Sequence, residues 1–165
     1  MNYLFPNLKI EKIVLYLICF HLCVLMSAYY IQYFMKIPAC KLCLYQRIPY
    51  MFSLIVLMYI YVLKKYVPYV VWLLIFTAFI NIVLSFYHIG IENEFFSEPG
   101  VCAIKDTINN PDLLLENLKR NMLVKCKDVY FKISGLSLAS INFLISIVLI
   151  VLYALLIIKW QKIKN

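Results

Sequence analysis

The sequence predicts an all-α membrane protein, a four-transmembrane-helix bundle with a short amphipathic helix in its second extracytoplasmic loop. The first observation is composition: 65% of the 165 residues are hydrophobic and the mean hydropathy is +0.87, against roughly 45–50% apolar residues in soluble domains. The second is that four apolar stretches each reach the length of about 20 residues that a helix needs to cross a bilayer. The third is that lysines gather at the ends of those stretches, as membrane proteins place them.

The four apolar stretches lie near residues 13–34, 44–63, 67–89 and 136–158. The first exceeds the 7–15 apolar residues of a typical signal peptide and no A-x-A cleavage site follows it, so we expect a retained helix. Outer loops are expected at about 35–43 and 90–134. Because no Ser/Pro-rich linker or internal repeat divides the chain, we expect residues 1–165 to form a single integral membrane domain.

The basic residues predict an orientation. One side of the predicted bundle has seven of them in short segments, namely Lys9, Lys12, Lys64, Lys65, Lys159, Lys162 and Lys164. The short loop on the other side carries Lys36, Lys41 and Arg47. The positive-inside rule then places both termini in the cytoplasm. The net charge of +8 therefore reflects membrane topology and does not indicate nucleic-acid binding.

Four of the six cysteines fall in the outer loops under this orientation: Cys40, Cys43, Cys102 and Cys126. Disulfides persist outside the cytosol, so these cysteines lie where a disulfide can survive. Between Cys102 and Cys126, "NNPDLLLENLKRNML" has a capping Asn110 followed by Pro111, which favours a helix start. The face that carries Leu114, Leu118 and Met122 would lie on the membrane surface.

Cys40 and Cys43 form a C-x-x-C pair at the edge of the second apolar stretch. This motif occurs in zinc sites, haem attachment sites and redox pairs. Haem attachment needs a histidine directly after the second cysteine, where Leu44 stands. A structural zinc site usually has two close ligand pairs, whereas Cys102 and Cys126 are single and far apart. A redox pair explains more of the sequence, although zinc and an accidental pair remain open.

The residues around the pair favour redox chemistry. Pro38 disfavours helix just before it, so a helix can begin near Ala39 or Cys40. Unpaired N–H groups at a helix N-terminus stabilise a thiolate. Arg47 follows Cys43 by four residues and therefore shares its helix face, where it can stabilise a thiolate or an anionic ligand. A snorkelling arginine that only anchors the helix is the alternative.

The stretch "CKLCLYQRIPY" (Cys40–Tyr50) resembles the CxxC-xYxR segment of the bacterial disulfide bond formation protein B family, DsbB. "FYHIGIENEFFSEPGVC" (Phe86–Cys102) resembles the family's segment leading to its third cysteine. Cys126 stands at the fourth, and "GLSLASIN" (Gly135–Asn142) is similar to the start of the last helix. The resemblance covers nearly the whole chain. Phenylalanines before Cys102, where many members have tryptophan, and Ile133-Ser134 before Gly135 are the departures.

The resemblance implies a thiol–quinone oxidoreductase of the bacterial inner membrane, with its cysteine pairs in the periplasm. A soluble DsbA-like thioredoxin-fold oxidase would attack Cys102, with Cys126 as the resolving cysteine. Exchange would pass electrons to Cys40 and Cys43, and a Cys43 thiolate would donate them to ubiquinone or menaquinone of the membrane pool, which feeds the respiratory chain. Arg47 and His88 are the expected quinone-binding residues; an interfacial histidine without a role is the alternative for His88.

Three other functions are compatible with parts of the sequence. A vitamin K epoxide reductase-like enzyme also uses a C-x-x-C and quinone, but that family places the motif late in the chain. A non-catalytic membrane protein could bind metal through its four outer thiols, and a passive scaffold could use two disulfides as staples. In "ICFHLC", Cys19 and Cys23 share a helix face while His21 lies about 200° away. We therefore expect no metal site there, packing roles for both thiols, and a His21 that faces another helix.

Overall fold

The computed structural model describes residues 10–63, 67–97, 126–127, 129, 131–133 and 135–164. These residues form the helices α1 (Ile10–Tyr33), α2 (Lys41–Leu63), α3 (Val67–Glu92) and α5 (Leu138–Lys164), with a short antiparallel pair of strands, β1 (Lys132–Ile133) and β2 (Leu136–Ser137). All four helices are long and apolar enough to cross a membrane. This confirms the predicted four-span α-helical bundle. Cys102 and the predicted amphipathic helix lie outside the described residues.

A side chain caps the start of α2, close to the start near Ala39 or Cys40 that the sequence predicts, and another caps the start of α5, which differs from the prediction. Cys40 caps α2, which therefore starts at Lys41 and includes Cys43. Ser137 Oγ accepts the backbone N–H of Ser140 at 3.2 Å, as an N-cap does. Helix α5 therefore begins at Leu138, and the two residues before it form β2, where a helical start was expected.

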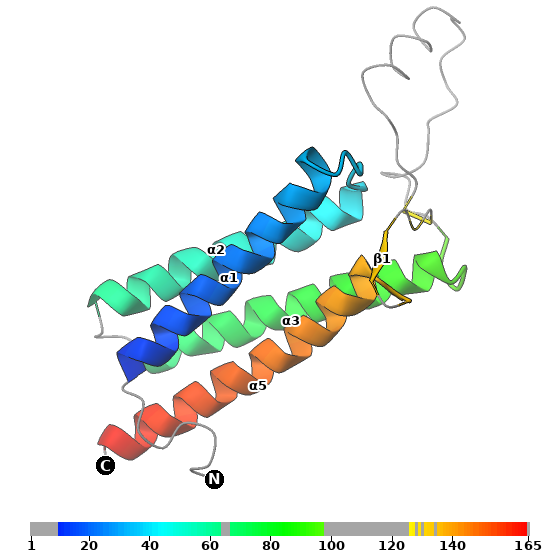
Figure 1. Cartoon of the computed structure of the whole chain (residues 1–165). Helices are drawn as coiled ribbons and strands as arrows, with labels where there is room; N and C mark the ends of the chain where they lie inside the picture. The colour runs from blue at the N-terminus through cyan, green and yellow to red at the C-terminus, as the bar shows by residue number, and fades with distance from the viewer. Residues whose placement is uncertain are drawn as a thin grey trace, which may run out of the picture.

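The helices form a bundle in which α1 packs on α2, α2 on α3 and α3 on α5, whereas α1 and α5 have few direct contacts. The end of α1, the start of α2, the end of α3 and the start of α5 lie at the same end of the bundle, next to β1 (Figure 1). This arrangement brings Cys40, Cys43 and Arg47 of α2 close to residues of α3 that are distant in sequence.

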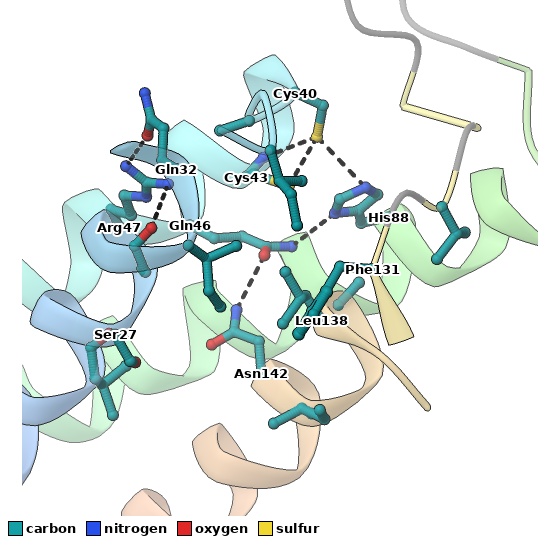
Figure 2. A pocket seen from close by; sticks show the side chains of 18 of the residues that line it. Ser27, Gln32, Cys40, Cys43, Gln46, Arg47, His88, Phe131, Leu138 and Asn142 are labelled. Atoms are coloured by element: carbon teal, nitrogen blue, oxygen red, sulfur yellow. Dashed lines mark hydrogen bonds between the residues drawn. The ribbon is translucent and has the colours of Figure 1, made fainter. Parts of the chain in front are cut away.

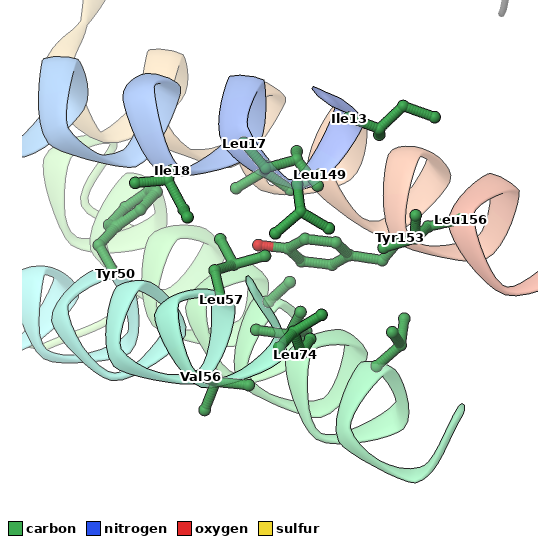
Figure 3. Packing of buried hydrophobic residues seen from close by; sticks show 14 of the residues in the cluster. Ile13, Leu17, Ile18, Tyr50, Val56, Leu57, Leu74, Leu149, Tyr153 and Leu156 are labelled. Carbon is green, nitrogen blue, oxygen red and sulfur yellow. The ribbon is translucent and has the colours of Figure 1, made fainter. Parts of the chain in front are cut away.

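The buried centre of the bundle is mostly aliphatic, and the hydrogen-bonded pair His21 and Tyr153 lies within it. Leu57, Leu74 and Tyr153 are completely buried, and Figure 3 shows Tyr153 surrounded by leucines. His21 Nδ1 donates to the carbonyl of Leu17 at 2.8 Å, so its Nε2 is free to accept the Tyr153 hydroxyl at 3.0 Å. His21 therefore faces another helix, as expected, and joins α1 to α5 through a hydrogen bond in the membrane interior.

The two other cysteines of α1 do not take the packing roles predicted for them. Cys19 and Cys23 are exposed on the surface of the bundle, where a transmembrane helix meets lipid. The prediction was wrong because periodicity shows that the two share a face, but not which face turns toward α2 and α5. The buried face of α1 instead carries Val14, Leu17, Ile18, His21 and Leu25.

Candidate functional site

The C-x-x-C pair lies at the N-terminus of α2. Cys40 is the residue before the helix, and its carbonyl accepts the N–H of Leu44 at 3.2 Å, which closes the first helical turn. Its Sγ accepts the N–H of Cys43 at 3.2 Å, so the sulfur itself is the capping group. Pro38 precedes it and limits extension of the helix backwards. The predicted position of both thiols at a helix N-terminus is therefore observed.

The two sulfur atoms of the pair are 2.9 Å apart, with the Cys40 thiol donating to Cys43 Sγ. Cys40 is buried, whereas Cys43 is partly accessible. The hydrogen bond to Cys43 and burial both raise the pKa of the Cys40 thiol, and the contact with His88 partly offsets them. Cys40 therefore keeps its proton more readily, and a single negative charge on the pair belongs on Cys43.

Arg47 lies one helical turn beyond Cys43, as its spacing predicted, but its guanidinium turns toward α1. Nη1 donates to Gln32 Oε1 at 2.6 Å and Nη2 to the carbonyl of Ala28 at 3.4 Å. The carbon Cζ also lies 4.9 Å from the ring centre of Tyr29, a cation–π distance. These contacts from α1 hold the charge at the wall of the cavity that Cys43 also lines.

His88, near the end of α3, approaches the pair from the side opposite Arg47 (Figure 2). Its Nε2 is 3.6 Å from Cys40 Sγ and 3.7 Å from Glu92 Oε1. Its Nδ1 is 3.3 Å from the amide nitrogen of Gln46. His88 is buried and contacts the first cysteine of the pair, while Arg47 lies on the side of the second.

Cys126 lies against the first cysteine pair. It is 2% exposed and packs in one buried cluster with Cys40, Leu42 and Ile91, with Cys43 at the border of that cluster. The next residue, Lys127, forms an ion pair with Glu94 just beyond α3. The described member of the second cysteine pair is thus brought to the first pair, although many residues separate them in sequence.

A cavity of about 190 Å³ opens beside these residues. Its apolar walls come from α1 and α5, including Val24, Ile31, Leu138 and Ile145. Its polar lining includes Cys40, Cys43, Gln46, Arg47, His88 and Cys126. Helices α1 and α5 make few direct contacts, and residues of both helices line this cavity. The site therefore combines an apolar chamber with three thiols, a guanidinium and an imidazole.

A polar network that was not predicted from the sequence lies behind the site. Asn142 donates to Gln46 Oε1 at 3.1 Å and to Ser85 Oγ at 2.9 Å, and accepts the Tyr50 hydroxyl at 2.6 Å. Asn81 adds contacts to the same residue. The available signal was that these polar side chains stand in apolar stretches, where they normally face the bundle interior.

The site also offers three possible ligands for a soft metal ion: Cys40, Cys43 and His88. Two sulfurs on a tetrahedral zinc with Zn–S bonds of about 2.3 Å lie about 3.8 Å apart, which is longer than the observed 2.9 Å. A zinc-bound histidine also donates its other ring N–H to an acceptor, whereas an amide nitrogen faces Nδ1 here. The geometry fits a pair of exchanging thiols better than a zinc centre.

Comparison with known proteins identifies a family whose model covers most of this chain. The family model described as "Disulfide bond formation protein DsbB" matches residues 11–156, from the first turn of α1 to near the end of α5. The chain is also 25% identical over 148 residues to an uncharacterized protein, RP370, of Rickettsia prowazekii (strain Madrid E). That alignment covers 87% of this chain and 85% of the relative.

Proposed function

The chain belongs to the DsbB family of disulfide bond formation proteins, and from this membership we propose that it is a thiol–quinone oxidoreductase that reoxidises a soluble DsbA-like dithiol oxidase. Membership identifies a membrane protein of disulfide bond formation with a disulfide oxidoreductase role. The electron acceptor, the partner and the roles of individual residues belong to the proposal, and they are supported by the geometry of the site.

The observation that carries the proposal is the burial of Cys126 against the Cys40–Cys43 pair, at the cavity that Arg47 and His88 also line. Disulfide exchange requires an attacking sulfur to reach a disulfide directly. A scaffold with two inert disulfides has no need to bring members of both pairs into one cluster. Contact between the pairs is what a two-stage electron relay needs.

The first stage would take place at Cys102 and Cys126. A partner thiolate attacks Cys102, a new S–S bond forms, and Cys126 leaves as a thiolate. The second partner thiolate then closes the partner's own disulfide and releases Cys102. The partner has lost two electrons and two protons, and the Cys102–Cys126 dithiol holds the two electrons.

The second stage would transfer those electrons to α2. The Cys126 thiolate attacks Cys40 of the Cys40–Cys43 disulfide, and Cys43 leaves as a thiolate. Cys102 then resolves the mixed bond between Cys126 and Cys40, so that the outer disulfide re-forms and the α2 pair is reduced. The raised pKa of Cys40 favours the reduced pair with its proton on Cys40 and its charge on Cys43, beside the cavity.

The cavity fits a membrane quinone. Its walls are apolar on the α1 and α5 sides, and Arg47 and His88 would hold the polar edges of a ring. When bound, a quinone of the ubiquinone or menaquinone type supplies a two-electron, two-proton acceptor linked to the respiratory chain. Arg47 is held at the cavity wall by Gln32 and Ala28, where its charge would stabilise a reduced quinone oxygen.

The proposal includes a topology. The C-x-x-C end of the bundle would face the periplasm of a bacterial inner membrane, and both termini would be cytoplasmic. The strands β1 and β2 lie at this same end (Figure 1). Thiols at that end would meet an oxidising compartment.

The test uses purified protein in lipid nanodiscs with a reduced thioredoxin-fold dithiol oxidase and a soluble quinone. We expect the ring absorbance to fall as the oxidase regains its disulfide, with one quinone consumed per disulfide. Cys43→Ser should abolish the reaction. Cys19→Ser, a matched change on the lipid-facing surface of α1, should leave it intact. Quinone reduction by Cys43→Ser, or none by the unaltered chain, would overturn the proposal.

A further inference from the structure

We propose that Asn142 and Gln46 form a positioning relay that holds neutral His88 with its proton on Nε2, so that the imidazole donates to the sulfur of Cys40 when that sulfur becomes anionic. The role in turnover rests on the proposed function, because the pair closes again only when Cys40 acts as a thiolate. The relay itself rests on hydrogen bonds in the structure. Gln46 and Asn142 act on the cysteine pair only through His88, so they are positioning residues.

The relay has a direction that starts at Tyr50. The Tyr50 hydroxyl donates to Asn142 Oδ1 at 2.6 Å, which leaves Nδ2 of the same amide as the donor to Gln46 Oε1 at 3.1 Å. Asn142 Nδ2 also donates to Ser85 at 2.9 Å, which agrees with this orientation. Because Gln46 Oε1 is used as an acceptor, its Nε2 is the atom that faces His88.

The orientation of Gln46 determines the tautomer of His88. An amide nitrogen carries only N–H donors, so the ring nitrogen opposite it, Nδ1 at 3.3 Å, must be the unprotonated one. A neutral imidazole then has its proton on Nε2, the atom 3.6 Å from Cys40 Sγ. The Cys40 thiol proton points to Cys43, so the Cys40 sulfur is the acceptor in its contact with His88.

Three groups face the contact between His88 and Cys40, and all of them affect it. Cys43 accepts the Cys40 proton, Glu92 lies 3.7 Å from the same His88 nitrogen, and the backbone of Cys126 hydrogen-bonds to His88. Burial and Cys43 oppose ionisation of Cys40, whereas His88 favours it. A correctly oriented imidazole is therefore the main neighbour that helps Cys40 become a nucleophile within a buried site.

The chain contains two histidines, and the structure gives them opposite tautomers. His21 donates from Nδ1 to the Leu17 carbonyl, so it provides an internal reference for ring ¹⁵N spectra of the reduced protein. We expect His21 protonated on Nδ1 and His88 on Nε2. In Gln46→Glu, the carboxylate can only accept, so His88 Nδ1 should gain a proton. The matched change Gln32→Glu places a carboxylate in the same cavity, at a residue bonded to Arg47. It should leave the His88 spectrum unchanged.

A His88 protonated on Nδ1 in the unaltered chain, or an unprotonated Nδ1 in Gln46→Glu, would overturn the relay.

A second readout is the pH dependence of Cys40 alkylation in the reduced protein, measured by mass spectrometry. Gln46→Leu and Asn142→Leu should both move this profile to higher pH and slow alkylation several-fold near neutrality. Ser53→Ala, which removes a buried hydrogen bond to Thr77 outside the relay, should not.

An equal shift in Ser53→Ala, or none in Gln46→Leu, would contradict the relay. Both measurements use reduced protein without partner or quinone. A contrary result in them therefore rejects the relay without testing the proposed function, which the separate quinone assay tests.

Discussion

Nη1 of Arg47 donates to Oε1 of Gln32 at 2.6 Å, and this bond joins the start of α2 to the end of α1. The guanidinium is therefore fixed at the cavity wall, with part of its donor set left for a ligand. The groups that accept its hydrogen bonds, Gln32 Oε1 and the Ala28 carbonyl, both lie on a neighbouring helix, which favours a positioned charge over a snorkelling anchor.

The first prediction concerns Arg47→Ala. A hydrogen bond to a charged group contributes about 1.5–3 kcal/mol, so the KM for quinone should rise by about tenfold or more, with a much smaller change in the KM for the partner oxidase. Gln32→Leu keeps the Arg47 charge but removes the hydrogen bond that holds it, so the KM for quinone should rise by less. Steady-state kinetics with each substrate varied in turn provide the measurement. Equal changes in both KM values would indicate a structural arginine.

The second prediction uses the burial of Cys126 against Cys40. In the variant Cys43→Ser, Cys102→Ser, mild oxidation should produce a Cys40–Cys126 disulfide, which peptide mapping under non-reducing conditions can detect. The exposed Cys19 and Cys23 remain in the same chain as controls and should not link to either residue. Recovery of Cys40 as a free thiol after oxidation would show that the pairs cannot exchange directly.

Sequence patterns predicted the parts of this molecule that depend on local chemistry. Hydropathy gives the four spans because crossing a bilayer imposes a length and an apolar content on each helix. Pro38 and the C-x-x-C spacing predict thiols at a helix start, and the four-residue step places Arg47 one turn beyond Cys43. Each of these inferences needs only one helix and its own period.

The relay could not be predicted because it depends on how three helices are rotated about their axes. Gln46, His88 and Asn142 come from α2, α3 and α5, and the spacing within one helix does not show that their side chains meet. The same ambiguity led to the wrong expectation for Cys19 and Cys23. The cap at Ser137 was missed because the short β1–β2 pairing before it follows from a turn at Gly135, whose φ is +85°.

The third prediction is a pH dependence at Glu94. Lys127 lowers the pKa of this carboxyl below its usual value, so the stabilisation from the ion pair is fully present above the usual pKa of about 4.3. It is lost as the pH falls through the lower, folded value. Hydrogen exchange at residues 126–127, corrected for intrinsic rates, should increase across that acidic window. Glu94→Gln should show the increased exchange already at neutral pH, and identical profiles would contradict the role of the ion pair.

The fourth prediction concerns the hydrogen bond between Tyr153 and His21 in the bundle interior. Tyr153→Phe leaves His21 Nε2 without its donor and should destabilise the protein by about 0.6–2 kcal/mol. Unfolding in mixed micelles measures the loss. In a double-mutant cycle with His21→Phe, the second change should cost less once the first is present, and strictly additive costs would show that the two side chains do not interact.

The fifth prediction concerns Gly90, where the end of α3 meets the ring of Phe96. A Cβ added at Gly90 would lie 2.1 Å from Cδ2 and 2.3 Å from Cε2 of Phe96, a ring that also stacks on Tyr87 with centroids 5.6 Å apart. Alanine gains up to about 1 kcal/mol in helix propensity, but forcing the ring away costs about 1–3 kcal/mol, so Gly90→Ala should be destabilising. Phe96→Ala removes the obstacle. In that background Gly90→Ala should become neutral or stabilising in thermal unfolding, and a loss that persists there would mean that the glycine is required for another reason.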